Sequence, residues 1–230
     1  MLLSGKNALV LDADDGIGTA ITALFRAEGA AVVSVAISGA EVAPAFDQAH
    51  ASLGGVDILV NAISDWGVGG PQGWRADRWR ELSERNGAVA VNAAQVALAG
   101  LRRPGAVCFI STTWAMATSP EMGLVGASKA AVGPITKALA LAGAAEGLRA
   151  NAVVMGLIDT PMLREVVGRR GQLAARPAGA SLFDETAQRV PMRRAGTAQE
   201  VAKAVAFLCS GRARMINGAS VLVDGGLLYA

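Results

Sequence analysis

Short apolar runs alternate with alanine-rich helical segments, and this alternation constrains the fold more than any other feature. Between the apolar runs lie segments with helical spacing, several of which end in glycine, a common residue after a helix C-terminus. Strands that alternate with helices predict an α/β fold of the Rossmann type: a doubly wound, parallel sheet with helices on both faces. Six runs have the length and the valine, isoleucine and leucine content of strands buried on both faces: NALVLDA, AAVVSVA, VDILVNA, AVCFIST, LRANAVVM and ASVLVDGG.

Length and composition are those of one domain over residues 1–230, with 52% hydrophobic residues. Residues 163–195 contain several glycines and prolines, so we expect an irregular segment there that serves as a lid or an interface loop. No uninterrupted apolar run reaches the ~18 residues that a membrane span needs. The N-terminus has no basic region before an apolar stretch, so we expect a cytoplasmic protein with no membrane partner.

Charge and potential metal ligands exclude several classes of function. The net charge of +2 is spread along the chain, which argues against a nucleic-acid partner. His50 is the only histidine and is expected on a helix surface, so no metal site and no histidine-based triad is predicted. Cys108 and Cys209 lie in apolar patterns and are expected to be buried as small hydrophobic residues, not paired in a disulfide.

Several short motifs follow one another in an order and spacing that resemble the classical short-chain dehydrogenase/reductase family. The resemblance covers the chain from end to end, and the ordered series is far more specific than a single glycine motif. The series is Gly16-Ile17-Gly18, Asp57-Ile58-Leu59-Val60-Asn61, Asn86, Ser111-Thr112, Lys129, Asn151-Ala152-Val153, Thr160-Pro161-Met162 and Val223-Asp224-Gly225-Gly226.

The resemblance implies NAD(P)-dependent hydride transfer at a serine, tyrosine and lysine site with a supporting asparagine. This chain keeps the asparagine as Asn86 and the lysine as Lys129, and the serine position falls on Thr112 or on Ser111. At the tyrosine position the chain has Val125. The family's tyrosine exchanges the proton of the alcohol, and losing a positioned general acid costs roughly 10²–10⁴-fold in rate.

The cofactor loop implied by the resemblance is also altered. In LDADDGIG, Asp12 stands where the family has a glycine that lets the backbone approach the pyrophosphate, and Asp14 and Asp15 precede Gly16 and Gly18. A carboxylate about 5 Å from a phosphate charge costs roughly 3 kcal/mol at an effective dielectric near 20. We expect these aspartates to satisfy the helix N-terminus instead of a cofactor.

The adenosine side lacks further family features. Ala36 occupies the position of the residue that contacts the ribose, and Ala62 replaces the asparagine of the motif near the nicotinamide. Residues 37–56 have room for one helix, whereas a helix, strand and second helix need ~30 residues. We therefore predict that the family's third strand, at the sheet edge, is deleted, that six strands remain, and that this chain binds no cofactor.

The residues leave three functional hypotheses open. The first is a catalytically inactive subunit that assembles with an active paralogue in a heterotetramer, with NAD(P) in the partner; a homotetramer or homodimer is the alternative. The family resemblance suggests an acyl-CoA-type hydroxy or keto substrate, such as 2-(hydroxybenzyl)succinyl-CoA. Tyr229, the only tyrosine, is then expected to pack at a subunit interface.

The second hypothesis is a divergent oxidoreductase, or a non-redox enzyme, that acts through Thr112, Asn86 and Lys129. The third is a ligand sensor that uses the vacated pocket. For Lys129 itself we expect either a solvated helix position or a pair with an acidic residue.

Overall fold

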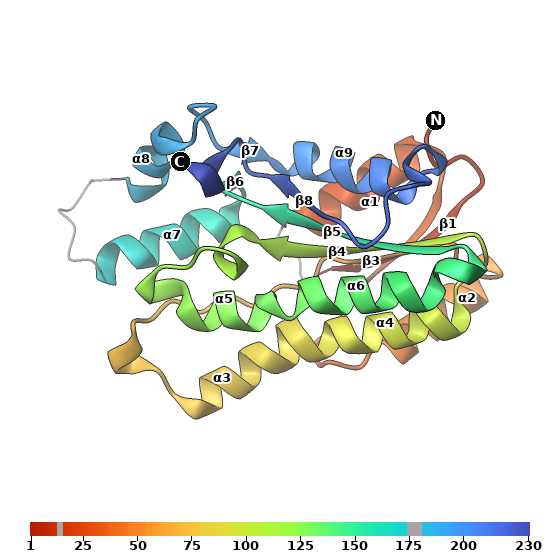
Figure 1. Ribbon diagram of the computed structural model, residues 1–230, viewed down its shortest axis with the longest axis horizontal. Helices are drawn as coiled ribbons and strands as arrows, with labels where there is room; N and C mark the ends of the chain where they lie inside the picture. Colours follow the sequence, from red (N-terminus) through yellow and green to blue (C-terminus); the bar gives the residue numbers. More distant parts are fainter. Residues whose placement is uncertain (13–15, 174–180) are drawn as a thin grey trace.

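A six-stranded parallel sheet forms the centre of the computed structural model, which describes residues 1–12, 16–173 and 181–230 (Figure 1). The strand order is β2-β1-β3-β4-β5-β8. The structure confirms the fold class and all six strands expected from the apolar runs. Their bounds are β1 (Asn7–Asp12), β2 (Ala31–Ala36), β3 (Ile58–Asn61), β4 (Gly105–Thr112), β5 (Leu148–Met155) and β8 (Ser220–Val223).

Helices cover both faces of the sheet (Figure 1). Successive strand residues point to opposite faces, so β1 contributes Ala8 and Val10 to one buried apolar cluster and Leu9 and Leu11 to the other. The two clusters together form the core. The helices on the first face are α1 (Ile17–Ala27) and α9 (Ala198–Cys209), and those on the second are α2 (Ala43–Leu53), α4 (Val89–Gly100) and α6 (Val132–Gly143).

The edge of the sheet confirms the predicted loss of a strand. β2 lies at the edge, and residues 37–57, all of which the structure describes, contain α2 and no strand. The turn after β2 is fixed from the neighbouring helical segment, because the Arg85 guanidinium donates to the carbonyls of Ile37 and Gly39 at 2.7 and 2.9 Å. The exposed His50 in α2 is also as predicted.

One long helical stretch runs from Pro120 to Glu146. By length and composition alone it could cross a membrane, but 44% of its most apolar window is buried, and α6 packs on β5 and α4. These contacts place part of the stretch in the core of the domain. It consists of η4 (Pro120–Met122), α5 (Gly123–Ala130), α6 and η5 (Ala144–Glu146).

The expectation of an irregular segment over residues 163–195 was wrong for the part that the structure describes. Two helices occupy most of it, α7 (Pro161–Leu173) and α8 (Leu182–Arg189), while residues 174–180 lie outside the described chain. Pro161 is the first residue of α7, a position where proline is tolerated. Gly168 lies inside α7 with no neighbouring atom within 4 Å of a Cβ placed there, and its low helix propensity does not prevent the helix. Whether this segment acts as a lid or an interface stays a prediction.

The remaining elements are short. A two-stranded parallel pair precedes α7 and α9, and short helices connect the larger elements. They are β6 (Ile158–Asp159), β7 (Gly196–Thr197), α3 (Ala76–Leu82), the π-helical η2 (Ser83–Ala88), and the 3-10 helices η1 (Pro71–Gly73), η3 (Thr113–Ala115), η6 (Gly211–Ala213) and η7 (Leu227–Tyr229).

Candidate functional site

The polar residues of the predicted site lie near the carboxyl ends of β3 and β4, where open α/β sheets bind ligands. Ser111 and Thr112 end β4, Asn86 lies in η2, and Val125 and Lys129 are one turn apart in α5. The Ser111 hydroxyl donates to the carbonyl of Lys129 at 3.5 Å, which brings β4 and α5 together. The structure thus brings the predicted positions Ser111 and Lys129 into contact.

The amide of Asn86 is fully engaged within the protein. Its Oδ1 accepts from the Asp65 N–H at 2.8 Å, and its Nδ2 donates to the Asp65 carbonyl at 3.0 Å and to Ser128 Oγ at 2.9 Å. Ser128 in turn donates to the carbonyl of Val125 at 2.9 Å. Asn86 thus fixes the segment after β3 against α5. It sits on a π-helical turn, a local irregularity that is frequent at functional sites.

Lys129 is buried, which corrects the expectation of a solvated helix lysine. Its side chain is 2% exposed, and Nζ donates to the carbonyl oxygens of Ile63 at 2.7 Å and Ile110 at 3.3 Å. The physical reason is reach: the four-carbon stem carries the ammonium past the helix surface to carbonyl groups that follow β3 and end β4. Lys129 therefore joins three elements of the fold.

Val125 lies in the core, at 0% exposure, in the same apolar cluster as Leu82, Met122 and Leu157. Its side chain has no group that can give or take a proton. Tyr229 does not replace it, because this residue lies in η7 and is 80% exposed. The chain's one tyrosine is thus not brought to Asn86 and Lys129.

A cavity of about 450 Å³ opens beside the end of β4. Thr112 lines it and starts η3 by accepting the Trp114 N–H at 3.4 Å, so Thr112, and not Ser111, faces the cavity. Asn86, Val125 and Lys129 are not among its lining residues. The structure therefore separates most of the predicted site from the open space beside it.

The helices α7 and α8 contribute two guanidinium groups to the lining, those of Arg170 and Arg189, and Arg170 is paired with Glu121 at 3.2 Å. Sequence reasoning missed both arginines, because they fall in the segment that was expected to be irregular. A sequence prediction of helices over 161–173 and 182–189 could have found them, because it would have placed each arginine on a helix beside the cavity.

Comparison with known proteins identifies the family. Residues 37–228 match the family model described as enoyl-(acyl carrier protein) reductase. The chain is also 31% identical over 263 aligned residues to 3beta-hydroxysteroid dehydrogenase 1 of Eggerthella lenta, covering 98% of this chain and 94% of that protein. The chain belongs to the short-chain dehydrogenase/reductase family.

Solved structures of short-chain dehydrogenases share the fold over nearly the whole chain. The ligand-free aldohexose dehydrogenase of Thermoplasma acidophilum has a TM-score of 0.86 and 28% identity, with 98% of this chain and 95% of that chain covered. A short-chain dehydrogenase of Burkholderia cenocepacia in complex with NADP has the same TM-score and identity, with 99% of both chains covered. The family is thus one of oxidoreductases, and one of these relatives holds a nicotinamide dinucleotide.

The N-terminus of α1 keeps part of the short-chain dehydrogenase cofactor site. Gly16 precedes α1 with a φ of 89°, a conformation that suits glycine. Gly18 is buried in the first turn. The N-terminus of a helix that follows a glycine is a position where many proteins of this fold class bind a phosphate. Asp14, Asp15 and the side chain of Asp12 lie outside the described residues, so the predicted role of these aspartates stays a prediction.

Other described side chains do not fit a nicotinamide dinucleotide. Ala36 ends β2 at the position where the family contacts a ribose, and it offers only a methyl group. Ala62 is fully buried, and its backbone N–H donates to the Leu11 carbonyl at 2.8 Å. Lys129 and Asn86 direct their polar atoms to neighbouring backbone groups. At Ala36 and Ala62 the described chain therefore offers a dinucleotide no polar side-chain contact.

Proposed function

We propose that this chain is a catalytically inactive short-chain dehydrogenase subunit that assembles with an active, paralogous NAD(P)-dependent dehydrogenase or reductase. The observation that carries the proposal is Val125, a fully buried aliphatic side chain four residues before the buried Lys129. A hydride-transferring site needs a group that exchanges the alcohol proton, and valine has none. The fold around this position is intact, so the replacement of the acid leaves the helix α5 and its packing in place.

The proposal places the cofactor in the partner subunit and none in this chain. Ala36 and Ala62 support it, since both stand where a side-chain contact with the dinucleotide is expected. The internal hydrogen bonds of Asn86 and Lys129 support it further, because these side chains already act as structural links. We extend the proposal to a cytoplasmic complex that acts on an acyl-CoA-type hydroxy or keto substrate, such as 2-(hydroxybenzyl)succinyl-CoA, with no nucleic-acid or membrane partner.

Exposed apolar side chains on α4 and α6 support assembly with a partner. The two helices lie side by side (Figure 1). Val91 and Leu98 on α4 and Leu141 on α6 are exposed, and Leu141 reaches 82%. Burying such groups against a partner releases roughly 25 cal/mol per Å² of apolar surface. We propose a heterotetramer, with a homotetramer or homodimer as the alternative assembly.

A second candidate function is a divergent or non-redox enzyme that acts through Thr112, Asn86 and Lys129. The observation in its favour is that Asn86 and Lys129 are held by hydrogen bonds beside the ends of β3 and β4, where Thr112 is the last residue of β4. Only Thr112 reaches the cavity, which makes this the weaker candidate.

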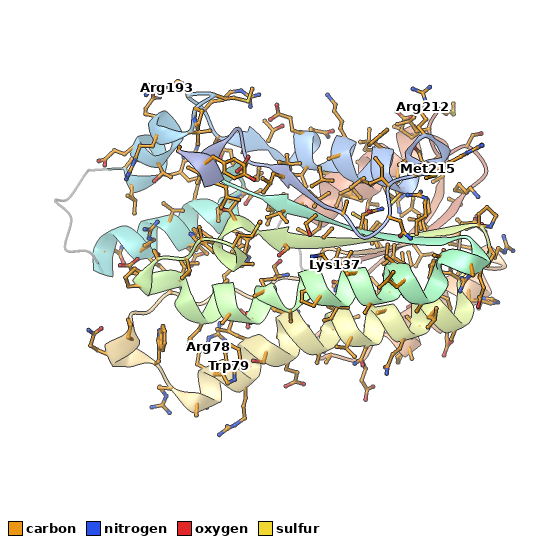
Figure 2. All side chains as sticks on the ribbon, in the orientation of Figure 1. Arg78, Trp79, Lys137, Arg193, Arg212 and Met215 are labelled. Carbon is orange, nitrogen blue, oxygen red and sulfur yellow. The ribbon has the colours of Figure 1, made fainter. Side chains whose placement is uncertain are left out.

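Co-purification tests the proposed assembly. A tagged copy of this chain, co-expressed with paralogous short-chain dehydrogenases of the same organism, should retain one of them, and activity should appear only in the complex. Leu141→Glu should abolish retention, because it places a charge on the proposed interface. The control is Met215→Glu, at a 95% exposed residue that Figure 2 shows away from α4. NAD(P)-dependent activity of this chain purified alone would contradict the proposal.

A further inference from the structure

The strand β2 leaves one edge of the sheet open. It pairs with β1 on one side and ends the strand order on the other. Residues 37–57, all described, add no strand beside it. Ala31, Ser34 and Ala36 are exposed, whereas every residue of β3 in the centre of the sheet is buried. An open edge therefore lies where the family's further strand is missing.

Alternate backbone groups of β2 point away from the sheet. The Ala31 N–H donates to the Lys6 carbonyl at 2.9 Å, so Ala31 faces β1. Because successive residues of a strand turn their N–H and C=O groups to opposite sides, Val32, Ser34 and Ala36 face outward. In the described part of the chain, no backbone hydrogen bond from another segment reaches these three residues from the open side.

This edge has little of the protection that sheet edges usually have. Natural proteins protect exposed edges with charged side chains, proline, a bulge or a covering loop. Residues 31–36 contain no charged residue and no proline, and their register with β1 runs without a bulge. Among the described residues, Arg26 alone donates a side-chain hydrogen bond to this strand, to the Val32 carbonyl at 3.2 Å. Such an edge is a template for pairing with another strand.

The strand is fixed in position for such pairing. The side chain of Val32 packs against the first core cluster, and those of Val33 and Val35 pack against the second. The contacts of Arg85 with the turn after β2 hold its far end. Because β2 is already ordered, it loses little conformational freedom when a second strand binds, which favours association.

The outward-facing pattern fits a second copy of the same strand. Two identical chains form a closed pair about a twofold axis, and edge strands related by an axis perpendicular to the sheet run antiparallel. With the axis at Ser34, this residue lies opposite its own copy, and Val32 lies opposite Ala36 of the second copy. Outward-facing residues then meet outward-facing residues, and such opposite pairs exchange both backbone hydrogen bonds. The Val32 carbonyl can keep Arg26, because its oxygen has two lone pairs.

Charge also favours a copy of this strand over a charged segment. A twofold contact brings identical residues together, which is unfavourable where they carry charge. Residues 31–36 carry none, and the side chain at the centre, Ser34, is small and exposed. An acidic or basic segment finds no counter-charge on this strand, whereas an uncharged strand matches it.

We propose that two copies of this chain pair through β2, antiparallel and centred on Ser34, so that their two six-stranded sheets become continuous. The contact uses backbone groups of the sheet edge. It requires neither the side chains of α4 and α6 that we propose for contact with a paralogue nor any residue of the polar cluster. It therefore goes beyond the proposed function and does not depend on it.

Sedimentation of charge-swapped variants tests the proposal. The full chain should form a dimer at high micromolar concentration. Ser34→Lys and Ser34→Glu should each raise its dissociation constant about tenfold, because like charges meet across the axis. An equimolar mixture of the two variants should restore the dimer, since opposite charges then meet. A monomeric chain, open-ended oligomers in place of a dimer, or a dimer unchanged by both substitutions would overturn the proposal.

Two control variants locate the contact. Ser220→Lys places the same charge on an exposed serine of β8, the opposite edge strand, and should leave the dimer unchanged. Leu141→Glu, which disrupts the proposed contact with a paralogue, should also leave it unchanged. Equal weakening by Ser34→Lys and Ser220→Lys, or a dimer that is lost only with Leu141→Glu, would refute pairing through β2.

Disulfide cross-linking adds a readout that also detects a weak dimer. Opposite residues of a hydrogen-bonded antiparallel pair have Cα atoms about 5.5 Å apart, within the range that a disulfide spans. Mild oxidation of Ser34→Cys should therefore join two chains, while Ser220→Cys should remain a single chain. The native Cys108 and Cys209 are buried and should not interfere. Equal cross-linking of the two variants would contradict the proposed pairing.

These outcomes separate the β2 contact from the proposed function. A monomeric chain that retains an active paralogue through α6 keeps the proposed function and excludes the β2 contact. A chain that pairs through β2 and is active with NAD(P) on its own keeps the contact and excludes the proposed function.

Discussion

At the scale of single residues, the polar cluster at the ends of β3 and β4 acts as a structural link. Lys129 donates to the carbonyls of Ile63 and Ile110, and Asn86 holds both backbone groups of Asp65. A buried carbonyl that loses its donor costs about 1–3 kcal/mol. This cost gives both side chains a structural role that is independent of any catalysis.

Lys129→Met tests this structural role. We expect the free energy of unfolding to fall by about 1–3 kcal/mol, because the carbonyls of Ile63 and Ile110 become buried without a donor. The control is Lys137→Met, at an exposed lysine on α6 (Figure 2), which should change stability by less than about 0.5 kcal/mol. Urea denaturation followed by circular dichroism measures both. Equal effects of the two substitutions would show that Lys129 has no special structural role.

Val125→Tyr restores the side chain that the family has at this position. Because Val125 is fully buried, the larger ring should overpack the core and lower stability by about 1–3 kcal/mol. No NAD(P)-dependent activity should appear, since the proposed function places the cofactor in the partner subunit and none in this chain. Val125→Ile is the conservative control for added volume. A stable, active Val125→Tyr variant would mean that only the acid has been lost.

Single residues were predictable from the sequence where a side chain is simply absent. Val125, Ala36 and Ala62 could be identified from their place in the motif series. The burial of Lys129 could not, because it depends on two carbonyl groups that lie 66 and 19 residues away in the chain. The burial of Cys108 and Cys209 was predicted correctly; their contact was not, although it raises the pKa of the Cys108 thiol, together with burial.

At the scale of elements, side-chain hydrogen bonds at the N-terminus of α9 hold the preceding loop against this buried helix. Thr197 and Glu200 form a reciprocal capping box, in which each side chain accepts the other's backbone N–H. Arg194 adds two hydrogen bonds to the Glu200 carboxylate, at 2.6 and 2.9 Å. These contacts anchor the segment between α8 and α9 to the first turn of α9.

Glu200→Gln should make the free energy of unfolding vary less between neutral and acid pH. The Arg194 hydrogen bond and the Thr197 N–H lower the pKa of Glu200 from 4.5 to about 2. A lowered carboxyl pKa stabilises the fold above pH 4.5, and this contribution is lost as the pH falls towards 2. We expect a loss of about 1 kcal/mol at neutral pH, limited by solvent screening, and a smaller loss at pH 3.

Urea unfolding at the two pH values measures this difference. The matched control is Lys203→Gln, at an exposed position of the same helix, which should have a small effect at both pH values. A destabilisation by Glu200→Gln that is the same at both pH values would contradict the assigned ion pair.

Strands and helices could be predicted where the hydrophobic pattern was strong, and were missed where glycines interrupt that pattern. The six strands followed from continuous apolar runs, since strands buried on both faces need them. The helix α7 was missed because Gly168 and Gly171 interrupt the pattern, although α7 buries Leu163, Val166 and Val167 against the core. Packing of an apolar face thus outweighed the low helix propensity of glycine.

At the scale of the whole molecule, the sheet tolerates the loss of an edge strand because its centre is unchanged. β1, β3, β4 and β5 remain paired in order, and α2 packs on both β1 and β2. The edge strand β2 pairs on one side only, and both core clusters are intact beside it. The family's overall fold is therefore kept with six strands.

Calorimetric titration of the purified chain with NADH and with NADPH tests the central claim most directly, with an active short-chain dehydrogenase measured in the same buffer as the control. A chain that has lost its cofactor site should give no saturable heat at millimolar concentrations of either dinucleotide. Micromolar affinity for either one would contradict the account, because it would show that a complete cofactor site exists despite Ala36, Ala62 and the missing edge strand.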